Sequence, residues 1–284
     1  MKPPSSQTVL ITGCSTGIGR ATAERLADAG FNVYATARKP ESITDLESRG
    51  CQALALDVTD EESMRGAVAA VEEADGAVDV LVNNAGFSQS GAVESVKLDD
   101  VRSQFETNVF GLLRMCQLVL PGMRRQGSGR IVNVSSMGGK LVFPGGGIYH
   151  ATKHAVEAIS DALRFEVKGF GVDVVVIEPG LIKTEFATAA VRSLGDGTED
   201  EGPYRDFNNS VGAATAGAYE GPLARLGGEP DSVARKIERA LGRRRPKTRY
   251  LVTASAHLVM AQRRLVSDRM WDAIVARSFP RPGT

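Results

Sequence analysis

Apolar runs of strand length alternate with amphipathic stretches of helix length through most of the chain. Several runs are nearly continuous in Val, Ile, Leu and Ala, as in strands buried on both faces of a parallel sheet. The repeated order of strand, helix and strand predicts an α/β fold, a doubly wound parallel sheet of about seven strands with helices on both faces. The predicted strands are 8–12, 32–37, 52–56, 78–82, 130–134, 172–177 and 249–252, and the predicted helices are 18–29, 61–73, 101–125, 150–168 and 231–241.

Size and composition suit one large domain spanning residues 1–284. A chain of 284 residues with 42% apolar residues can bury a substantial core, which argues against disorder. The 34 Lys and Arg balance the 34 Asp and Glu, so the net charge favours neither nucleic acid nor a membrane as a partner. No 18 apolar residues follow one another, and the apolar run at 8–12 is too short for a signal peptide. We therefore expect a cytoplasmic protein without an integral membrane segment.

Cysteine and histidine carry no metal or disulfide signal. The three cysteines, Cys14, Cys51 and Cys116, are odd in number and widely spaced, as reduced thiols of a cytosolic protein would be. The three histidines add no ligand spacing. We expect neither a disulfide nor a bound metal.

A glycine-rich turn joins the first predicted strand to the first predicted helix. It reads Thr-Gly-Cys-Ser-Thr-Gly-Ile-Gly over residues 12–19, with a spacing of Gly-x3-Gly-x-Gly. Glycines permit the tight turn and a close approach of a ligand, and the free N–H groups of a helix start attract pyrophosphate. The sequence therefore predicts a dinucleotide-binding loop. Its candidate residues are Gly13, Ser15, Thr16, Gly17, Ile18 and Gly19.

This turn and the motifs that follow resemble the short-chain dehydrogenase/reductases. Asp57-Val58 closes the third strand, Asn83-Asn84-Ala85-Gly86 follows the fourth, and Pro179-Gly180-x3-Thr184 follows the sixth. The resemblance covers residues 7–185 motif by motif and implies a Rossmann-like single domain that binds a nicotinamide dinucleotide. It also implies that Asp57 and Val58 contact the adenine, and it adds Asn84, Ala85, Gly86, Pro179, Gly180 and Thr184 to the cofactor site.

The end of the second strand indicates which nicotinamide dinucleotide is bound. NAD sites use a carboxylate there to accept a hydrogen bond from the ribose 2′-OH. Here the strand is followed by Arg38-Lys39, and no acid occurs before Glu41. Arginine offers a planar fork suited to a 2′-phosphate. We expect NADP(H) to be preferred, with NAD(H) possible because Arg38 and Lys39 can also be read as solvated residues at a helix start.

Tyr149 and Lys153 lie four residues apart in a helical pattern and so share a face. Interconverting a carbonyl and an alcohol requires a group that gives or takes a proton at oxygen, and a nearby ammonium favours the tyrosinate. Ser136 ends the fifth strand and can hydrogen-bond the substrate oxygen; the spacing of the resembling family favours it over Ser135. The resemblance further implies that Lys153 reaches the nicotinamide ribose and that Asn108 anchors a water linked to Lys153. We treat His150 and His154 as packing or surface residues.

Two regions depart from the strand and helix alternation. Residues 185–230 are rich in glycine, include the acidic patch 199–201 and show poor periodicity, which predicts a long loop. The resemblance places the substrate lid there, and Phe186, Tyr204, Phe207, Tyr219 and Leu223 could close over a hydrophobic alcohol, ketone or aldehyde. Residues 255–284 suggest a C-terminal helical extension, serving core packing or a subunit contact. The basic run 243–245 reads as a solvated turn.

The sequence thus predicts an NADP(H)-dependent oxidoreductase of a secondary alcohol or carbonyl. Residues 31–38 and the extended C-terminus look like the hydroxysteroid and retinol dehydrogenase branch, which implies a lipophilic substrate. An NAD-dependent alcohol dehydrogenase of the same fold is the nearest alternative, and a dinucleotide-binding sensor without catalysis is a more distant one. Similar proteins pair through the two long helices, here 101–125 and 150–168, so we expect a homodimer or homotetramer.

Overall fold

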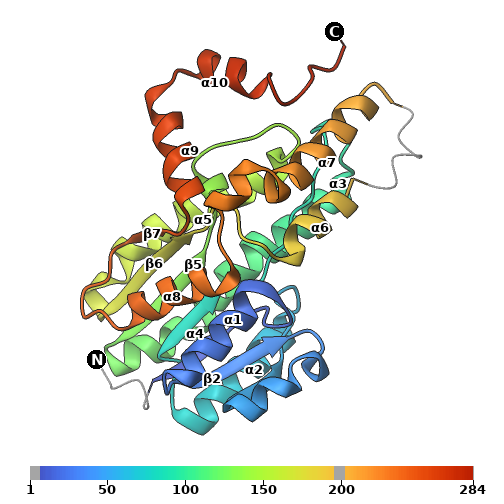
Figure 1. The fold of residues 1–284 in the computed structure, drawn as a ribbon. Helices are drawn as coiled ribbons and strands as arrows, with labels where there is room; N and C mark the ends of the chain where they lie inside the picture. Colours follow the sequence, from blue (N-terminus) through green and yellow to red (C-terminus); the bar gives the residue numbers. More distant parts are fainter. Residues whose placement is uncertain (1–6, 195–201, 284) are drawn as a thin grey trace.

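The computed structural model describes residues 7–194 and 202–283 (Figure 1). Its seven strands form one parallel sheet in the order β3-β2-β1-β4-β5-β6-β7. The strands are β1 (Thr8–Ile11), β2 (Asn32–Ala37), β3 (Cys51–Ala55), β4 (Val80–Asn83), β5 (Gly129–Val134), β6 (Val172–Glu178) and β7 (Arg249–Leu251). The strand order reverses between β1 and β4, and ligands of doubly wound sheets bind in the crevice at such a point. The predicted fold class is confirmed.

Helices cover both faces of this sheet, because alternate strand residues point to opposite sides (Figure 1). Val9 and Ile11 of β1 belong to a core shared with α1 and α8, whereas Leu10 belongs to a second core shared with α2, α4 and α5. These helices are α1 (Gly17–Asp28), α2 (Glu61–Asp75), α4 (Leu112–Gln126), α5 (Gly147–Glu166) and α8 (Pro230–Leu241).

The predicted helix 101–125 is not continuous. It consists of α3 (Leu98–Phe105), a π-helical turn (Glu106–Gly111) and α4. Such wide turns inside a helix are rare and occur frequently at functional sites. Asn108 lies within this turn and is fully buried.

The prediction of a long loop over 185–230 is wrong for most of that region. The structure forms α6 (Glu185–Arg192), α7 (Arg205–Glu220) and a 3₁₀ turn (Pro222–Leu226) there. The start of α6 is defined locally, since the Thr184 hydroxyl accepts a hydrogen bond from the Phe186 N–H. The acidic patch 199–201 lies outside the described residues.

The C-terminal extension contains two helices, α9 (Ala254–Leu265) and α10 (Asp268–Val275). Each begins at a hydroxyl cap, Thr253 and Ser267 respectively. Leu141, Met260 and Trp271 form a small third core beneath these helices. The other short turns are 3₁₀ helices at Pro40–Ser42, Thr44–Arg49, Met137–Gly139 and Lys168–Phe170. Among the described residues, no helix has the length and apolar composition needed to cross a bilayer.

Candidate active site

The glycine loop lies between β1 and α1, beside the point where the strand order reverses. Gly13 and Gly17 have φ angles of 74° and 59°, a conformation that L side chains rarely adopt. A Cβ on Gly19 would lie 2.2 Å from the Gly13 carbonyl oxygen. Thr16 precedes α1 without capping it through its side chain, and no acidic residue occupies the first turn. The N–H groups of this helix start are therefore open to an anion, so the loop fits a pyrophosphate.

Backbone and side-chain hydrogen bonds fix this loop to its neighbours. The Cys14 N–H donates to the Thr36 carbonyl at 2.7 Å. The Asn84 amide donates to the carbonyls of Thr12 and Gly13, at 3.0 and 2.9 Å. The Thr12 hydroxyl accepts from the N–H groups of Asn84 and Ala85, both at 3.0 Å. Asn84 therefore shapes the loop. Thr12 was not among the residues predicted from the sequence. Its position as a hydroxyl residue directly before Gly13 is a signal that could have identified it.

The residues predicted for the adenine end follow β2 and β3. Arg38 and Lys39 are exposed just beyond β2, and within the described chain their side chains make no ion pair or hydrogen bond. Val58 is buried, and the Asp57 carboxylate accepts hydrogen bonds from the Thr59 N–H and hydroxyl at 2.9 and 2.8 Å. Arg38 and Lys39 are thus free to meet a phosphate, whereas Asp57 is partly engaged by its own turn.

Ser136 and Tyr149 meet at the carboxyl end of β5. Ser136 starts the turn after β5, and Tyr149 lies in the first turn of α5. Burial raises the pKa of Tyr149, and the hydrogen bond with Ser136 opposes that shift. Ser135, the residue before Ser136, is buried, and its hydroxyl has no hydrogen-bond partner in the described structure.

Lys153 lies one helical turn after Tyr149, with its Nζ 5.8 Å from the centre of the tyrosine ring. Its ammonium donates to the Val134 carbonyl at 2.9 Å. Burial lowers the pKa of Lys153 to about 8, and the nearby Glu157 opposes that shift. The sequence argument expected Lys153 and the positive charge of a bound nicotinamide to favour the tyrosinate. In the chain alone, burial is the largest influence on either side chain, and it disfavours the charged form of each.

The π-helical turn brings Asn108 against α5, the helix that carries Tyr149 and Lys153. Its amide N–H groups donate to the Phe87 carbonyl at 2.9 Å and the Thr152 hydroxyl at 3.1 Å, and its Oδ1 accepts from the Phe87 N–H at 3.0 Å. A Cβ on Gly86 would lie 3.0 Å from Asn108 Oδ1. Asn108 therefore fixes the segment after β4 to α5. Thr152, the partner on α5, was not among the sequence candidates.

The segment after β6 packs against the turn after β5 and against the glycine loop. The Pro179 carbonyl accepts from the Met137 N–H at 2.8 Å. A Cβ on Gly180 would lie 2.3 Å from the Thr253 hydroxyl, and one on Gly17 would lie 3.3 Å from Thr184. The start of α6 thus rests on the glycine loop, so the predicted cofactor residues from β1 and β6 lie together.

Aromatic residues of the predicted lid are divided between the site and the surface. The Phe186 ring packs edge-on against Tyr149 with 5.3 Å between ring centres. Tyr219 is close enough to raise the pKa of Tyr149. The Tyr204 hydroxyl instead donates to Glu94 at 2.7 Å. Phe186 therefore gives Tyr149 an apolar cover, and Tyr219 lies near the same phenol.

His150 is a packing residue in this structure. It is buried, its Nδ1 lies 3.1 Å from the Gly138 carbonyl, and its ring packs against those of Phe143 and Tyr149. Burial lowers its pKa to about 4, which keeps the ring neutral near pH 7.

Comparison of the amino-acid sequence with known proteins identifies relatives of this chain. Residues 7–194 match the family model of the short chain dehydrogenases. The chain is 38% identical to oxidoreductase BOA17 of Botryotinia fuckeliana over 87% of this chain and 88% of that protein. It is 41% identical to a 3-ketodihydrosphingosine reductase of Bacteroides thetaiotaomicron, over 70% and 72%. It is 34% identical to an NADPH-dependent 3-dehydrocapnine reductase of Ornithobacterium rhinotracheale, over 93% and 94%.

Solved structures agree with this assignment. A short-chain dehydrogenase from Streptomyces avermitilis superposes with a TM-score of 0.74 at 33% identity, covering 94% of this chain and 97% of that one. A short chain dehydrogenase/reductase from Burkholderia phymatum in complex with NAD superposes with a TM-score of 0.79 at 25% identity, covering all of both chains. The chain belongs to the short-chain dehydrogenase family and is an NAD(P)-dependent oxidoreductase.

Proposed function

We propose that this enzyme interconverts a lipophilic carbonyl and its secondary alcohol, using NADP(H), with Tyr149 as the general acid and base. The observation that carries the proposal is the meeting of Ser136, Tyr149 and Lys153 beneath the apolar ring of Phe186. When bound, the nicotinamide supplies or accepts a hydride.

The three side chains divide the remaining work. The Ser136 hydroxyl, which acts against burial to lower the pKa of Tyr149, holds the substrate oxygen next to the Tyr149 phenol. Because burial raises the tyrosine pKa, the phenol is protonated near neutral pH and is ready to give its proton to the oxygen of a carbonyl being reduced. In oxidation the Tyr149 phenolate takes the proton of the alcohol, and a charged Lys153 stabilises that phenolate before the transfer. Asn108 holds α5 in register and, by resemblance, anchors a water beside Lys153.

The free fork of Arg38 supports NADP(H) as the preferred cofactor, since no carboxylate takes its place at the end of β2. A relative's dependence on NADPH adds to this preference, whereas the NAD complex of another relative keeps NAD(H) as the alternative. Phe186 and Tyr219 support an apolar substrate. Because relatives are named as reductases of 3-ketodihydrosphingosine and 3-dehydrocapnine, these two ketones are the first to assay.

The substitution Tyr149→Phe tests the proposal. Loss of the phenol proton should lower the turnover number by roughly 10²- to 10⁴-fold. Binding of NADPH, measured by fluorescence titration, should stay close to that of the wild type because the glycine loop is untouched. His150→Asn, at the packing residue next in sequence, is the matched control and should retain most turnover. Normal turnover by Tyr149→Phe would contradict the assignment of the proton donor.

A further inference from the structure

The charges of this neutral chain are divided unevenly between its two ends. Residues 232–284 contain 13 Lys and Arg but only 3 Asp and Glu, a net charge of +10. Because the whole chain sums to zero, residues 1–231 carry −10. Such an asymmetry indicates interaction of the basic part with a polyanion or an anionic surface.

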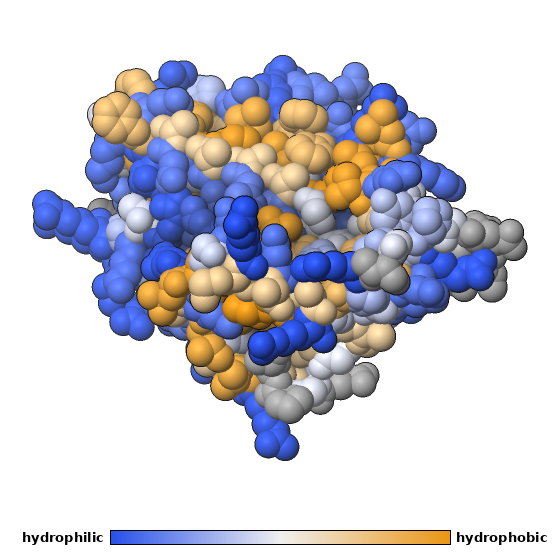
Figure 2. All heavy atoms as spheres, turned by 90° about the horizontal axis from the view of Figure 1, so that it is seen from above, coloured by the Kyte–Doolittle hydropathy of each residue, from blue (hydrophilic) through white to orange (hydrophobic). Residues whose placement is uncertain are grey.

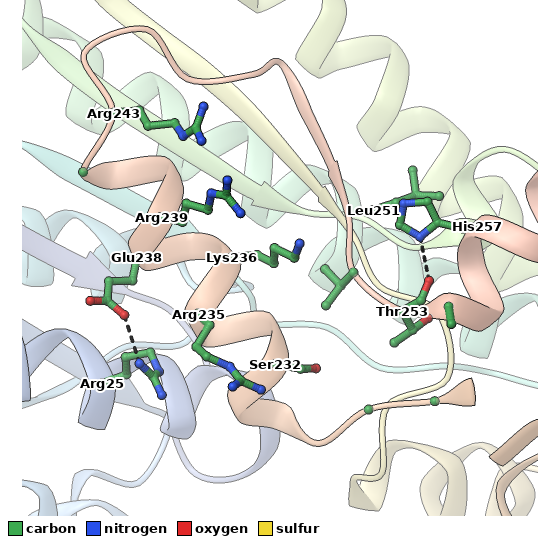
Figure 3. A pocket seen from close by; sticks show the side chains of 15 residues that line it. Arg25, Ser232, Arg235, Lys236, Glu238, Arg239, Arg243, Leu251, Thr253 and His257 are labelled. Carbon is green, nitrogen blue, oxygen red and sulfur yellow. Dashed lines mark hydrogen bonds and ion pairs between the residues drawn. The ribbon is translucent and has the colours of Figure 1, made fainter. Parts of the chain in front are cut away.

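A cleft concentrates part of this positive charge. It has a volume of about 960 Å³ and lies between α8 and the segment that runs from β7 into α9 (Figure 3). The side chains of Lys236 and Arg239 extend into it from α8, that of Arg243 extends from the turn after α8, and Thr253 and His257 form the opposite wall (Figure 3). A second cavity of about 480 Å³ shares Lys236, Arg239, Arg243 and His257 with the first and continues to Lys247 and Arg264.

These cations are not neutralised by the protein. Over residues 7–194 and 202–283, the side chains of Lys236, Arg239 and Arg243 make no ion pair or hydrogen bond. The nearby acids are occupied elsewhere, since Asp231 and Glu238 bind Arg25 at 2.6 and 3.0 Å. The cleft therefore presents uncompensated positive charge to solvent.

Two exposed leucines of α9, Leu258 and Leu265, lie beside the face of this helix that lines the second cavity. His257, Ala261 and Arg264 line the second cavity and recur at the spacing of one helix face. Leu258 and Leu265 are seven residues apart and lie about a quarter turn from that face. They are 54% and 85% exposed, and Met270 of α10 is 56% exposed. Figure 2 shows the whole molecule from above, and groups of hydrophobic side chains alternate with hydrophilic ones across that face. Cations beside exposed leucines are typical of helices that lie in a membrane interface.

The same two helices rest on the loop that joins the candidate catalytic residues. Leu141, between Ser136 and Tyr149, packs against Met260 and Trp271. The Trp271 indole N–H donates to the Val142 carbonyl at 3.1 Å, and the Val142 side chain is 46% exposed. A surface that contacts α9 and α10 would therefore lie next to the active-site loop.

We propose that the face formed by α8, β7 and α9 docks this protein on an anionic lipid surface. Lipid phosphates enter the basic cleft, and Leu258 and Leu265 enter the boundary between headgroups and acyl chains. A soluble anion would fill one cavity and leave both leucines exposed to water. A nucleic acid would bind the cations but would not bury the leucine side chains. This inference does not depend on the proposed reaction, because it rests on residues outside the active site.

The test is co-sedimentation of the purified full chain with lipid vesicles. The protein should pellet with vesicles made of equal parts phosphatidylglycerol and phosphatidylcholine, but not with phosphatidylcholine alone. Salt at about 1 M, where the screening length is roughly 3 Å, should release most of it. Binding to both kinds of vesicle, or to neither, would overturn the proposal.

Paired variants separate the contributions of charge and leucines. R239E with R243E should weaken vesicle binding by roughly 25-fold or more, at about fivefold for each cation removed. L258S with L265S should weaken vesicle binding by at least roughly tenfold, since the two leucine side chains no longer gain from leaving water. Both leucines are exposed, so their replacement leaves the fold intact. K97E with L98S, two exposed residues at the start of α3, is the matched control and should bind as the wild type does.

Other partners give distinguishable results. Binding of an oligonucleotide that R239E/R243E abolishes and L258S/L265S leaves intact, without vesicle binding, would assign the face to nucleic acid and reject the lipid. A fall in molecular mass of L258S/L265S in solution, again without vesicle binding, would assign it to a second copy of the chain. NADPH titration of every variant checks that the cofactor site is still folded.

Discussion

At the residue scale, Arg38 is the side chain that best distinguishes the two cofactors. A hydrogen bond to a charged group contributes about 1.5 to 3 kcal/mol, so Arg38→Ala should weaken NADPH binding by roughly 10- to 100-fold. NADH lacks the 2′-phosphate and should bind the variant about as well as the wild type. Fluorescence titration with both cofactors measures this difference, with Lys39→Ala as the neighbouring control of smaller effect. Tighter binding of NADH than NADPH to the wild type would reject the NADP(H) preference and leave the catalytic residues in place.

Glu178, at the end of β6, gives a residue-scale prediction about stability. Burial and the nearby Glu157 raise the pKa of Glu178 to about 7, although Arg249 opposes the shift from 3.3 Å. Because the folded state holds this proton more tightly, the resulting stabilisation is complete below the unfolded pKa, near 4.5, and is lost as the pH rises through 7. Thermal unfolding of Glu178→Gln should therefore depend less on pH between about 4.5 and 7 than that of the wild type. Equal slopes would show that Glu178 is ionised in the folded protein across this range.

At the scale of elements, the contact between the glycine loop and α1 tolerates no side chain at Gly19. An alanine Cβ there would meet the Gly13 carbonyl oxygen at 2.2 Å, which must push the loop away from α1. Gly19→Ala should thus weaken binding of either dinucleotide at least about tenfold, as measured by calorimetry. Gly66→Ala in α2 is the matched control, since its Cβ meets nothing within 4 Å and should stabilise the helix by up to about 1 kcal/mol. Unchanged affinity of Gly19→Ala would mean that the loop does not hold the pyrophosphate.

The elements that could be predicted from the sequence are those whose pattern lies within a short stretch of consecutive residues. The seven strands were predictable because each is a short, nearly continuous run of apolar residues between turns. Helices α6 and α7 were missed because small residues dominate them, and Gly212 and Gly217 interrupt the apolar period of α7. The π-helical turn at Asn108 has no sequence signature, since its hydrogen bonds to Phe87 and Thr152 join segments far apart in the chain.

At the scale of the whole molecule, the total charge concealed a property that the distribution reveals. A sum of zero suggested no attraction to a membrane, yet the last 53 residues carry +10. This split could have been read from the sequence alone. The cleft could not, because it needs α8 beside the segment that runs from β7 into α9, so that Lys236 and Arg239 of α8 face one space (Figure 3). The same limit applies to the site, where motifs predicted the residues but not the cover that Phe186 forms over Tyr149.

Assembly is the remaining prediction at this scale. The helices expected to pair two subunits include α4 and α5, and Phe165 on α5 is 88% exposed. Burying this side chain would contribute about 1.5 to 3 kcal/mol, and a twofold interface would bury it twice. Phe165→Ser should therefore weaken a dimer through these helices by at least roughly a hundredfold and shift the mass measured by light scattering toward the monomer. Leu265→Ser, on the face assigned to lipid, should leave that mass unchanged. If instead Leu265→Ser dissociates the oligomer and Phe165→Ser does not, the subunits meet through α9 rather than through α4 and α5.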